Sequence, residues 1–200
     1  MNPTVLVLAC GALAHELVEL QRRNGWTHWQ IRCLPAELHN TPNKIPDEVR
    51  AALRHWQDDY EQVFVAYADC GTGGLLDPVL AEFGVERLPG AHCYSFFAGE
   101  EVFTRLAEQE PGSFYLTDFL ARHFERLVTR GLGLDRHPQL RDEYFRNYRR
   151  LVFLDQAGDA ELLDQARAHA AFLGLEFHHQ PTGLGPLDLV LKERMATWPS

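Results

Sequence analysis

Short apolar runs and longer amphipathic stretches alternate along this chain in a repeated order. Three times, a strand-like run leads through a turn into a helix and then into a second short strand. The strand runs are rich in Val, Leu and Phe without polar alternation, which is typical of parallel strands covered on both faces by helices. The units span about residues 4–40, 62–97 and 150–183. We therefore predict an α/β fold with mostly parallel sheet(s) built from three related β-α-β units.

The element boundaries follow from this pattern and from the residues that end helices. Gly25 and Gly174 follow two of the predicted helices, because glycine adopts the left-handed conformation that ends a helix. A further helix opens at Pro46, and an inserted, mostly helical segment is expected around residues 98–148. The predicted strands are 4–9, 29–34, 62–68, 85–88, 151–154 and 175–177, and the helices between paired strands are 12–24, 75–83 and 160–173.

Length and charge narrow the class of protein. Two hundred residues suit a single α/β domain over residues 1–200 with a well-buried core. The formal net charge of −9 argues against non-specific nucleic-acid binding, which needs clustered Lys and Arg. The apolar run that ends at Cys10 is too short to cross a membrane, and no Lys or Arg precedes it. We expect a cytoplasmic protein with a small-molecule ligand or substrate and neither nucleic-acid nor membrane partners; its oligomeric state stays open.

The first two units carry nearly the same chemistry. Each has a cysteine after its first strand and a histidine soon after its second strand. These residues are Cys10 and His39 in the first unit, and Cys70 and His92 in the second, where Cys93 follows directly. Ligands in open α/β sheets bind outside the carboxyl ends of the strands. We therefore expect these side chains to lie on one rim of the fold.

Thiolate and imidazole are the ligands that zinc and iron prefer in proteins, so this rim is a candidate metal site. The predicted ligands are Cys10, His39, Cys70, His92 and Cys93, with Asp69 and Glu16 as candidate catalytic groups. The alternative is that Cys10 and Cys70 are small residues packed at strand ends. Cys33 lies within a predicted strand and is interpreted as a core or strand-surface residue.

The loop after the second cysteine is rich in glycine. Gly71, Thr72, Gly73 and Gly74 precede a helix, and their backbone amides are candidate contacts for an anion such as a phosphate or carboxylate. The loop lacks the lysine of a Walker-type sequence and the spacing of a dinucleotide fingerprint. A plain tight turn is the alternative.

The third unit repeats the scaffold without the cysteine. Asp155 and Gln156 follow its first strand, and His178 and His179 are expected in the loop after its second strand. They are possible additions to the same rim, and which histidine completes the site stays open.

Several stretches of the chain resemble the uncharacterised prokaryotic family called domain of unknown function 1638. They are Ala9–Leu13 with Glu16, Leu38–Asn40, Tyr67–Gly73, His92–Tyr94 and Phe114–Phe119. The family has no settled activity, so the resemblance implies no reaction. The three-unit architecture is loosely similar to quinolinate synthase and the diphthamide-forming enzymes, in which each of three units supplies one cysteine to an iron–sulfur cluster. This chain has Gln156 in the third unit instead.

The leading functional hypothesis is a metal-dependent enzyme that acts on a small molecule. Zinc is favoured over an iron–sulfur cluster because imidazole is as well represented as thiolate. A non-catalytic carrier of a metal, cofactor or small anion, and a metal-free enzyme with Cys70 as nucleophile, are the alternatives.

Overall fold

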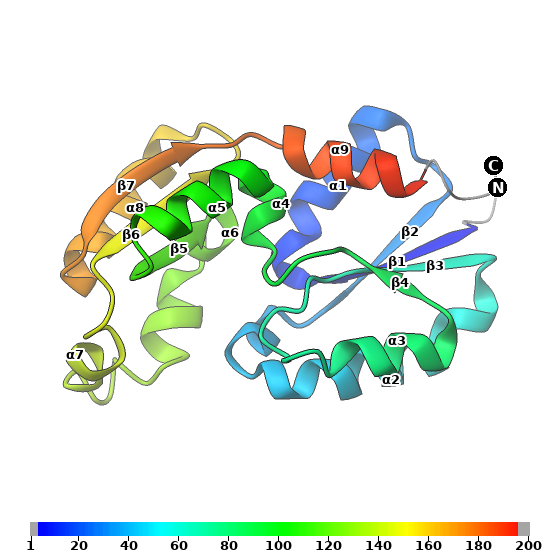
Figure 1. Ribbon diagram of the computed structural model, residues 1–200, viewed down its shortest axis with the longest axis horizontal. Helices are drawn as coiled ribbons and strands as arrows, with labels where there is room; N and C mark the ends of the chain where they lie inside the picture. The colour runs from blue at the N-terminus through cyan, green and yellow to red at the C-terminus, as the bar shows by residue number, and fades with distance from the viewer. Residues whose placement is uncertain (1–3, 196–200) are drawn as a thin grey trace. The chain divides into compact units, whose positions relative to one another are not determined.

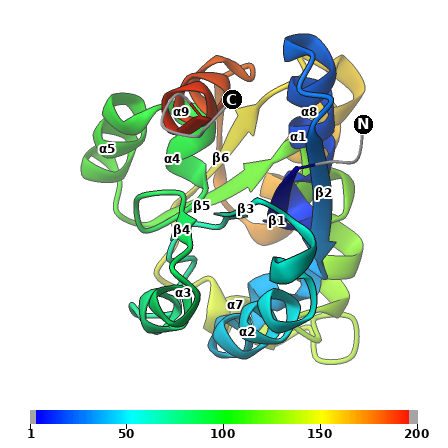
Figure 2. The same cartoon turned by 90° about the vertical axis from the view of Figure 1, so that its right-hand side faces the viewer.

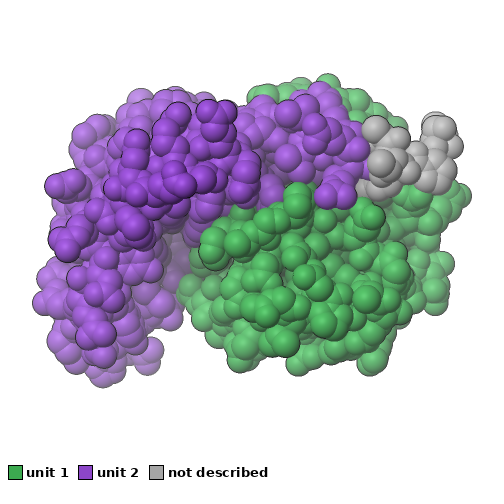
Figure 3. All heavy atoms as spheres, viewed as in Figure 1, with its two compact units in different colours: residues 1–93 green, residues 94–200 purple. Residues whose placement is uncertain are grey.

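The computed structural model describes residues 4–195 and divides the chain into two compact units (Figure 1). The first unit spans residues 1–93 and the second spans residues 94–200 (Figure 3). Each unit has its own parallel sheet, so each is described separately below. The prediction of a single domain over the whole chain stays a prediction.

The first unit contains four strands and three longer helices within the described residues. In chain order they are β1 (Val5–Cys10), α1 (Ala14–Asn24), β2 (Trp29–Leu34), α2 (Ile45–Trp56), β3 (Gln62–Ala66), α3 (Leu76–Phe83) and β4 (Glu86–Arg87). Short 3₁₀ turns lie between them, namely η1 (Gly11–Leu13), η2 (Ala36–Asn40), η3 (Pro42–Lys44) and η4 (Gln57–Asp59). Gly25 and Gly84 follow α1 and α3 with φ values of 67° and 63°, the left-handed conformation predicted for Gly25.

The sheet of the first unit has the order β2-β1-β3-β4, and each neighbouring pair is parallel. The chain runs from β1 outward to β2, and then crosses back past β1 to β3. Figures 1 and 2 show the consequence: α1 covers one face of this sheet, and α2 and α3 cover the other. The carboxyl ends of β1 and β3 form the point where the strand order reverses, which is where open α/β sheets bind ligands.

The core of this unit explains why its strands lack polar alternation. Residues 5–9 of β1 and 64–66 of β3 are buried throughout, because helices cover both faces. Leu8, Val65 and Tyr67 pack on the face covered by α2 and α3, and Cys10 and Cys70 border the same cluster. The helices are amphipathic, and their apolar sides close this core.

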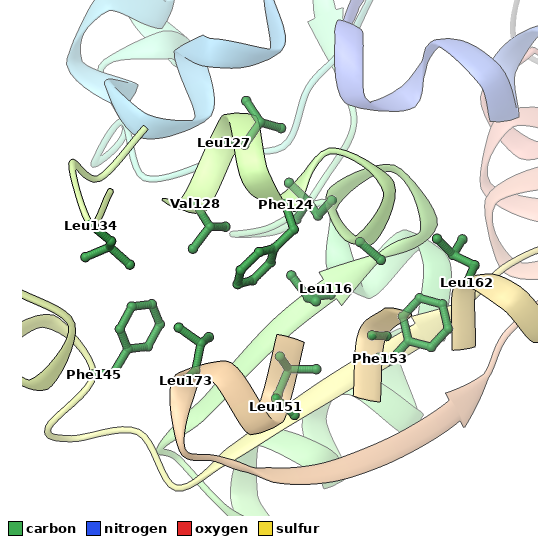
Figure 4. Packing of buried hydrophobic residues seen from close by; sticks show 14 residues of the cluster. Leu116, Phe124, Leu127, Val128, Leu134, Phe145, Leu151, Phe153, Leu162 and Leu173 are labelled. Atoms are coloured by element: carbon green, nitrogen blue, oxygen red, sulfur yellow. The ribbon is translucent and has the colours of Figure 1, made fainter. Parts of the chain in front are cut away.

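The second unit has three strands within the described residues. Its elements are α4 (Tyr94–Ala98), α5 (Glu100–Gln109), β5 (Ser113–Thr117), α6 (Asp118–Arg122), the π-helical turn η5 (Glu125–Arg130), α7 (Leu140–Tyr144), β6 (Arg150–Asp155), α8 (Ala160–Leu173), β7 (Glu176–Pro181) and α9 (Gly185–Met195). The sheet order is β5-β6-β7, and both pairs are parallel. Figure 4 shows the core on one face of this sheet, where Leu116, Leu151 and Phe153 meet Phe124 and Leu173.

The predicted α/β class is confirmed, and so are the three β-α-β units, which are β1-α1-β2, β3-α3-β4 and β6-α8-β7. Two details differ from the sequence prediction. The first two units share one sheet, whereas the third lies in the other. The inserted segment around 98–148 is mostly helical but also contains β5, whose residues Phe114, Tyr115 and Thr117 suit a strand better than a helix.

Candidate functional site

The carboxyl edge of the first sheet collects the predicted ligands. Cys10 is the last residue of β1, and His39 lies in η2 directly beyond β2. Cys70 follows β3, while His92 and Cys93 follow β4. Because all four strands are parallel, their carboxyl ends meet at one edge. The rim predicted for these five residues therefore forms within a single unit.

Two backbone hydrogen bonds fix the loop that carries Cys70 to the loop that carries Cys93. The amide of Asp69 donates to the carbonyl of Gly90 over 3.1 Å, and the amide of Cys70 donates to the carbonyl of Ala91 over 2.9 Å. The two loops thus continue the pairing of their strands beyond the sheet.

The thiol of Cys93 hydrogen bonds to the sulfur of Cys70. This bond lowers the pKa of Cys70, and the backbone amides of Ala68 and Cys93 lower it further against the opposing effect of burial. The same bond raises the pKa of Cys93, and burial adds to that increase. The pair therefore consists of a Cys70 sulfur that is stabilised as an acceptor and a Cys93 thiol that keeps its proton.

Cys70 also has an unusual backbone conformation. Its φ is 51°, and it is the one non-glycine residue with positive φ among residues 4–195. The left-handed region costs an L-residue about 1–2 kcal/mol relative to ordinary conformations. Strain of this kind is concentrated at functional sites, so this conformation singles out Cys70.

Cys10 and Tyr67 form the floor of the rim. Burial raises the pKa of the Cys10 thiol to about 11, while the backbone amide of Ala12 opposes that shift. Burial also raises the pKa of Tyr67, whose hydroxyl lies beside the Cys10 sulfur. Tyr67 is 1% exposed, and the hydrogen bond between its hydroxyl and the Cys10 sulfur lowers the pKa of Cys10 and adds to the increase at Tyr67.

His39 and His92 lie near one another at the rim. Loss of hydration lowers the pKa of His39, and repulsion from His92 lowers it further. Both effects favour a neutral imidazole at His39, which is the form that binds metals.

The backbone amides of the glycine-rich loop donate hydrogen bonds to Asp69, which directly precedes Cys70. One carboxylate oxygen of Asp69 accepts hydrogen bonds from the Thr72 hydroxyl (2.6 Å) and the amide of Gly74 (2.7 Å), and the other accepts from the amide of Gly73 (3.1 Å). The Thr72 hydroxyl is the largest influence that lowers the pKa of Asp69. Asp69 therefore holds the loop that carries Cys70, and in this conformation the amides of Gly73 and Gly74 serve Asp69 instead of an external anion.

Glu16, the other predicted catalytic group, lies in α1 and is 3% exposed.

Gly11, directly after Cys10, lies where β1 approaches the chain beyond β2. A Cβ at Gly11 would come within 2.9 Å of the carbonyl oxygen of Leu34. Glycine is therefore required at this position for the rim to close.

Within residues 4–195, no three His, Cys, Asp or Glu side chains are arranged as a metal-binding group. The thiols of Cys10, Cys70 and Cys93 are near enough to influence one another's pKa. They do not surround a common point as the ligands of a metal ion would. Cys33 is also close enough to influence Cys10 and Tyr67.

The candidates of the third β-α-β unit belong to the second sheet. His178 and His179 belong to β7 itself, which runs to Pro181, so the prediction that they lie in the following loop is wrong. The C-terminal half of β7 pairs in parallel with β6, and this register places Phe153 opposite His179 and Asp155 opposite Pro181. The Nε2 atom of His179 is 2.8 Å from a carboxylate oxygen of the buried Asp155.

Tyr67 and Asp118 are buried polar residues to which the sequence analysis assigns no role in a site. Tyr67 lies one residue beyond β3, and the buried position of its hydroxyl depends on the packing of α2 and α3. Asp118 is buried at the end of β5, where its two carboxylate oxygens accept the amides of Gln156 (3.0 Å) and Ala157 (2.9 Å). Burial raises the pKa of Asp118. A signal for this position is Thr117, whose type is common at helix N-caps and whose hydroxyl caps α6 directly before Asp118.

Fold and site together define a parallel α/β protein with a cluster of cysteines and histidines at the carboxyl edge of its first sheet. None of the helices in residues 4–195 has the length and apolar character needed to cross a membrane. The chain belongs to the family described as Protein of unknown function (DUF1638), whose model matches residues 33–191, as the sequence resemblance indicated. No curated protein and no solved structure matches the chain.

Proposed function

We propose that this protein is a metal-dependent enzyme that acts on a small molecule at the carboxyl edge of its first sheet. The observation that carries the proposal is that Cys10, Cys70 and Cys93 follow three different strands at one edge of the sheet and are near enough to influence one another's pKa.

The donor set suits a soft or borderline metal ion. Thiolates of Cys10, Cys70 and Cys93 would serve as ligands, with an imidazole from His39 or His92 as an additional donor. Metal binding would replace the hydrogen bond between Cys93 and Cys70, because a coordinating thiol loses its proton. The buried hydroxyl of Tyr67 beside Cys10 would then have a thiolate to which it donates.

Zinc remains the favoured metal. A zinc ion held by three of these four donors would keep a position open, where a water or a substrate thiol loses its proton near neutral pH. Three thiolates also suit an iron–sulfur cluster, which is the alternative cofactor. The proposal places the protein in the cytoplasm, where thiols stay reduced.

Anaerobic purification followed by elemental analysis and a visible spectrum tests the proposal. We expect close to one equivalent of zinc per chain and a colourless protein, whereas a coloured protein with iron would indicate the cluster. Cys10→Ser, Cys70→Ser and Cys93→Ser should each bind less metal, and Cys33→Ser is the matched control that should bind as much as the wild type. A metal content below about one tenth of an equivalent per chain would refute the proposal.

A metal-free enzyme that uses Cys70 as nucleophile is the second candidate. It is favoured by the strained backbone of Cys70 and by the hydrogen bonds that its sulfur accepts. Alkylation of metal-free protein at neutral pH discriminates the two functions. Preferential labelling of Cys70 in a protein that never binds metal would favour the nucleophile.

A further inference from the structure

A cavity in the second unit is separate in sequence from every residue of the site described above. It has a volume of about 300 Å³ and is lined by residues 141–148, in and after α7, and by residues 173–175, at the C-terminal end of α8. This volume is at the lower end of the range of roughly 300–1,000 Å³ that small-molecule sites occupy. The cavity therefore has room for a small ligand.

One part of the cavity lining is aromatic and apolar. Phe145 and Leu173, which Figure 4 shows side by side, line the cavity and belong to the buried core. The ring of Tyr148 meets Phe114 edge to face, with 5.7 Å between ring centroids, and is tilted against Phe145 at 5.5 Å. Tyr148 nevertheless stays 38% exposed. A ring that is held in place and keeps an open surface is one on which a flat ligand stacks.

Two arginines line the cavity, and their surroundings differ. The Arg141 guanidinium donates to the carbonyl of Phe172 (3.2 Å) and pairs with Asp142 (3.0 Å), so its charge is already compensated. Arg146 is exposed and has no ion pair or hydrogen bond with its side chain among residues 4–195. Its guanidinium keeps its donors for a ligand, and a guanidinium binds a carboxylate or a phosphate through paired hydrogen bonds.

The segment that carries the cavity is basic, although the whole chain is acidic. Residues 122–150 contain eight of the 19 Lys and Arg residues and four of the 28 Asp and Glu residues. Their formal charge is therefore +4, in a chain with a formal net charge of −9. A local excess of positive charge raises the concentration of anions around it.

We propose that this cavity binds a small anion whose charged group is carried on a flat ring, as in a nucleoside monophosphate or an aromatic carboxylate. The ring stacks on Tyr148, and the anionic group accepts hydrogen bonds from Arg146. The carboxylate of Asp142 repels the anionic group from the side of Arg141, which leaves Arg146 as its partner. The proposal rests on residues of the second unit alone and is independent of the proposed metal site.

Equilibrium dialysis of the full chain with adenosine monophosphate and with 4-hydroxybenzoate tests the proposal. These two ligands distinguish a nucleotide from an aromatic carboxylate. Adenosine and phenol lack the anionic group, and inorganic phosphate lacks the ring. We expect one of the two ring-bearing anions to bind about tenfold or more tightly than its uncharged counterpart and than inorganic phosphate.

Variants place the binding in the cavity. Arg146→Gln should weaken it by about tenfold or more, because the hydrogen bonds to the anionic group are lost. Tyr148→Leu should weaken it as well, whereas Tyr148→Phe, which keeps the ring, should bind as the wild type does. Arg149→Gln is the matched control, because it removes the same charge from an exposed arginine that does not line the cavity. Circular dichroism spectra check that each variant keeps its fold.

Three results would overturn the proposal. If neither ring-bearing anion binds with a dissociation constant below about 1 mM, the cavity is not a site for this class of ligand. If inorganic phosphate binds as tightly as adenosine monophosphate and 4-hydroxybenzoate, the ring makes no contact. If Arg149→Gln weakens the binding as much as Arg146→Gln, the basic segment attracts anions without a defined site.

Discussion

The positive φ of Cys70 predicts a difference in unfolding free energy between two variants that both lack the thiol. Cys70→Gly and Cys70→Ala both remove the thiol and its contact with Cys93, so the comparison between these variants isolates the effect of one Cβ atom at φ 51°. An L-residue in the left-handed region is destabilised by about 1–2 kcal/mol. Glycine loses about 0.5–1 kcal/mol through the greater freedom of its unfolded chain. Cys70→Gly should therefore be more stable than Cys70→Ala by about 0.5–1 kcal/mol.

Urea unfolding followed by tryptophan fluorescence measures this difference, which corresponds to about 1–4 °C in melting temperature for a chain of this length. Ala81→Gly is the control, because Ala81 is exposed in α3 and glycine there should destabilise the protein by about 1 kcal/mol. The two comparisons thus have opposite signs. If Cys70→Ala were as stable as Cys70→Gly, Cys70 would carry no backbone strain, and the argument that the strain is retained for function would fail.

Three further predictions concern residues that shape the two sheet edges. Gly11→Ala should destabilise the protein by about 1–3 kcal/mol in the same urea assay, because its Cβ would meet a backbone carbonyl at 2.9 Å. Gly185→Ala is the control, because a Cβ at Gly185 would meet nothing within 4 Å, and it should be neutral or slightly stabilising. Asp69 has a pKa below its unfolded value, so its contribution is present above about pH 4 and is lost as pH falls through the folded pKa. The stability difference between the wild type and Asp69→Asn, measured by thermal unfolding from pH 7 to pH 3, should shrink in that acid range, and a constant difference would contradict this. Asp118→Ala leaves two backbone amides without their carboxylate and should cost about 2–4 kcal/mol in unfolding free energy, whereas a cost below about 1 kcal/mol would show that water replaces the carboxylate.

Local patterns predicted most of the secondary structure, and the reason lies in short-range physics. Gly25 ends α1 because glycine tolerates a positive φ, and Thr117 caps α6 because its hydroxyl accepts the amide of Leu120. The Val- and Leu-rich strands were recognised because burial on both faces removes polar alternation. The strand β5 was missed, since Phe114 to Leu116 form an apolar run that also fits the start of a helix.

The candidate site could be predicted in part for the same reason. A cysteine or histidine after each strand of a parallel sheet must lie at one edge, so Cys10, His39, Cys70 and His92 were assigned to a common rim. The roles of Asp69 and His179 were not predictable, because they depend on which atoms each side chain reaches. Asp69 bonds to its own loop, and His179 reaches Asp155 across two paired strands.

The sequence by itself determined the α/β class, the three β-α-β units and the residues that follow each strand, because hydrophobic periodicity and turn residues act over a few positions. Tertiary structure decided how the strands are shared between two sheets and which side chains meet. It joined Cys70 to Cys93, set the Tyr67 hydroxyl beside Cys10 and placed the third unit in a separate sheet. Contacts of this kind depend on strand order and on the approach of distant loops, and neither is encoded in the local spacing of residues.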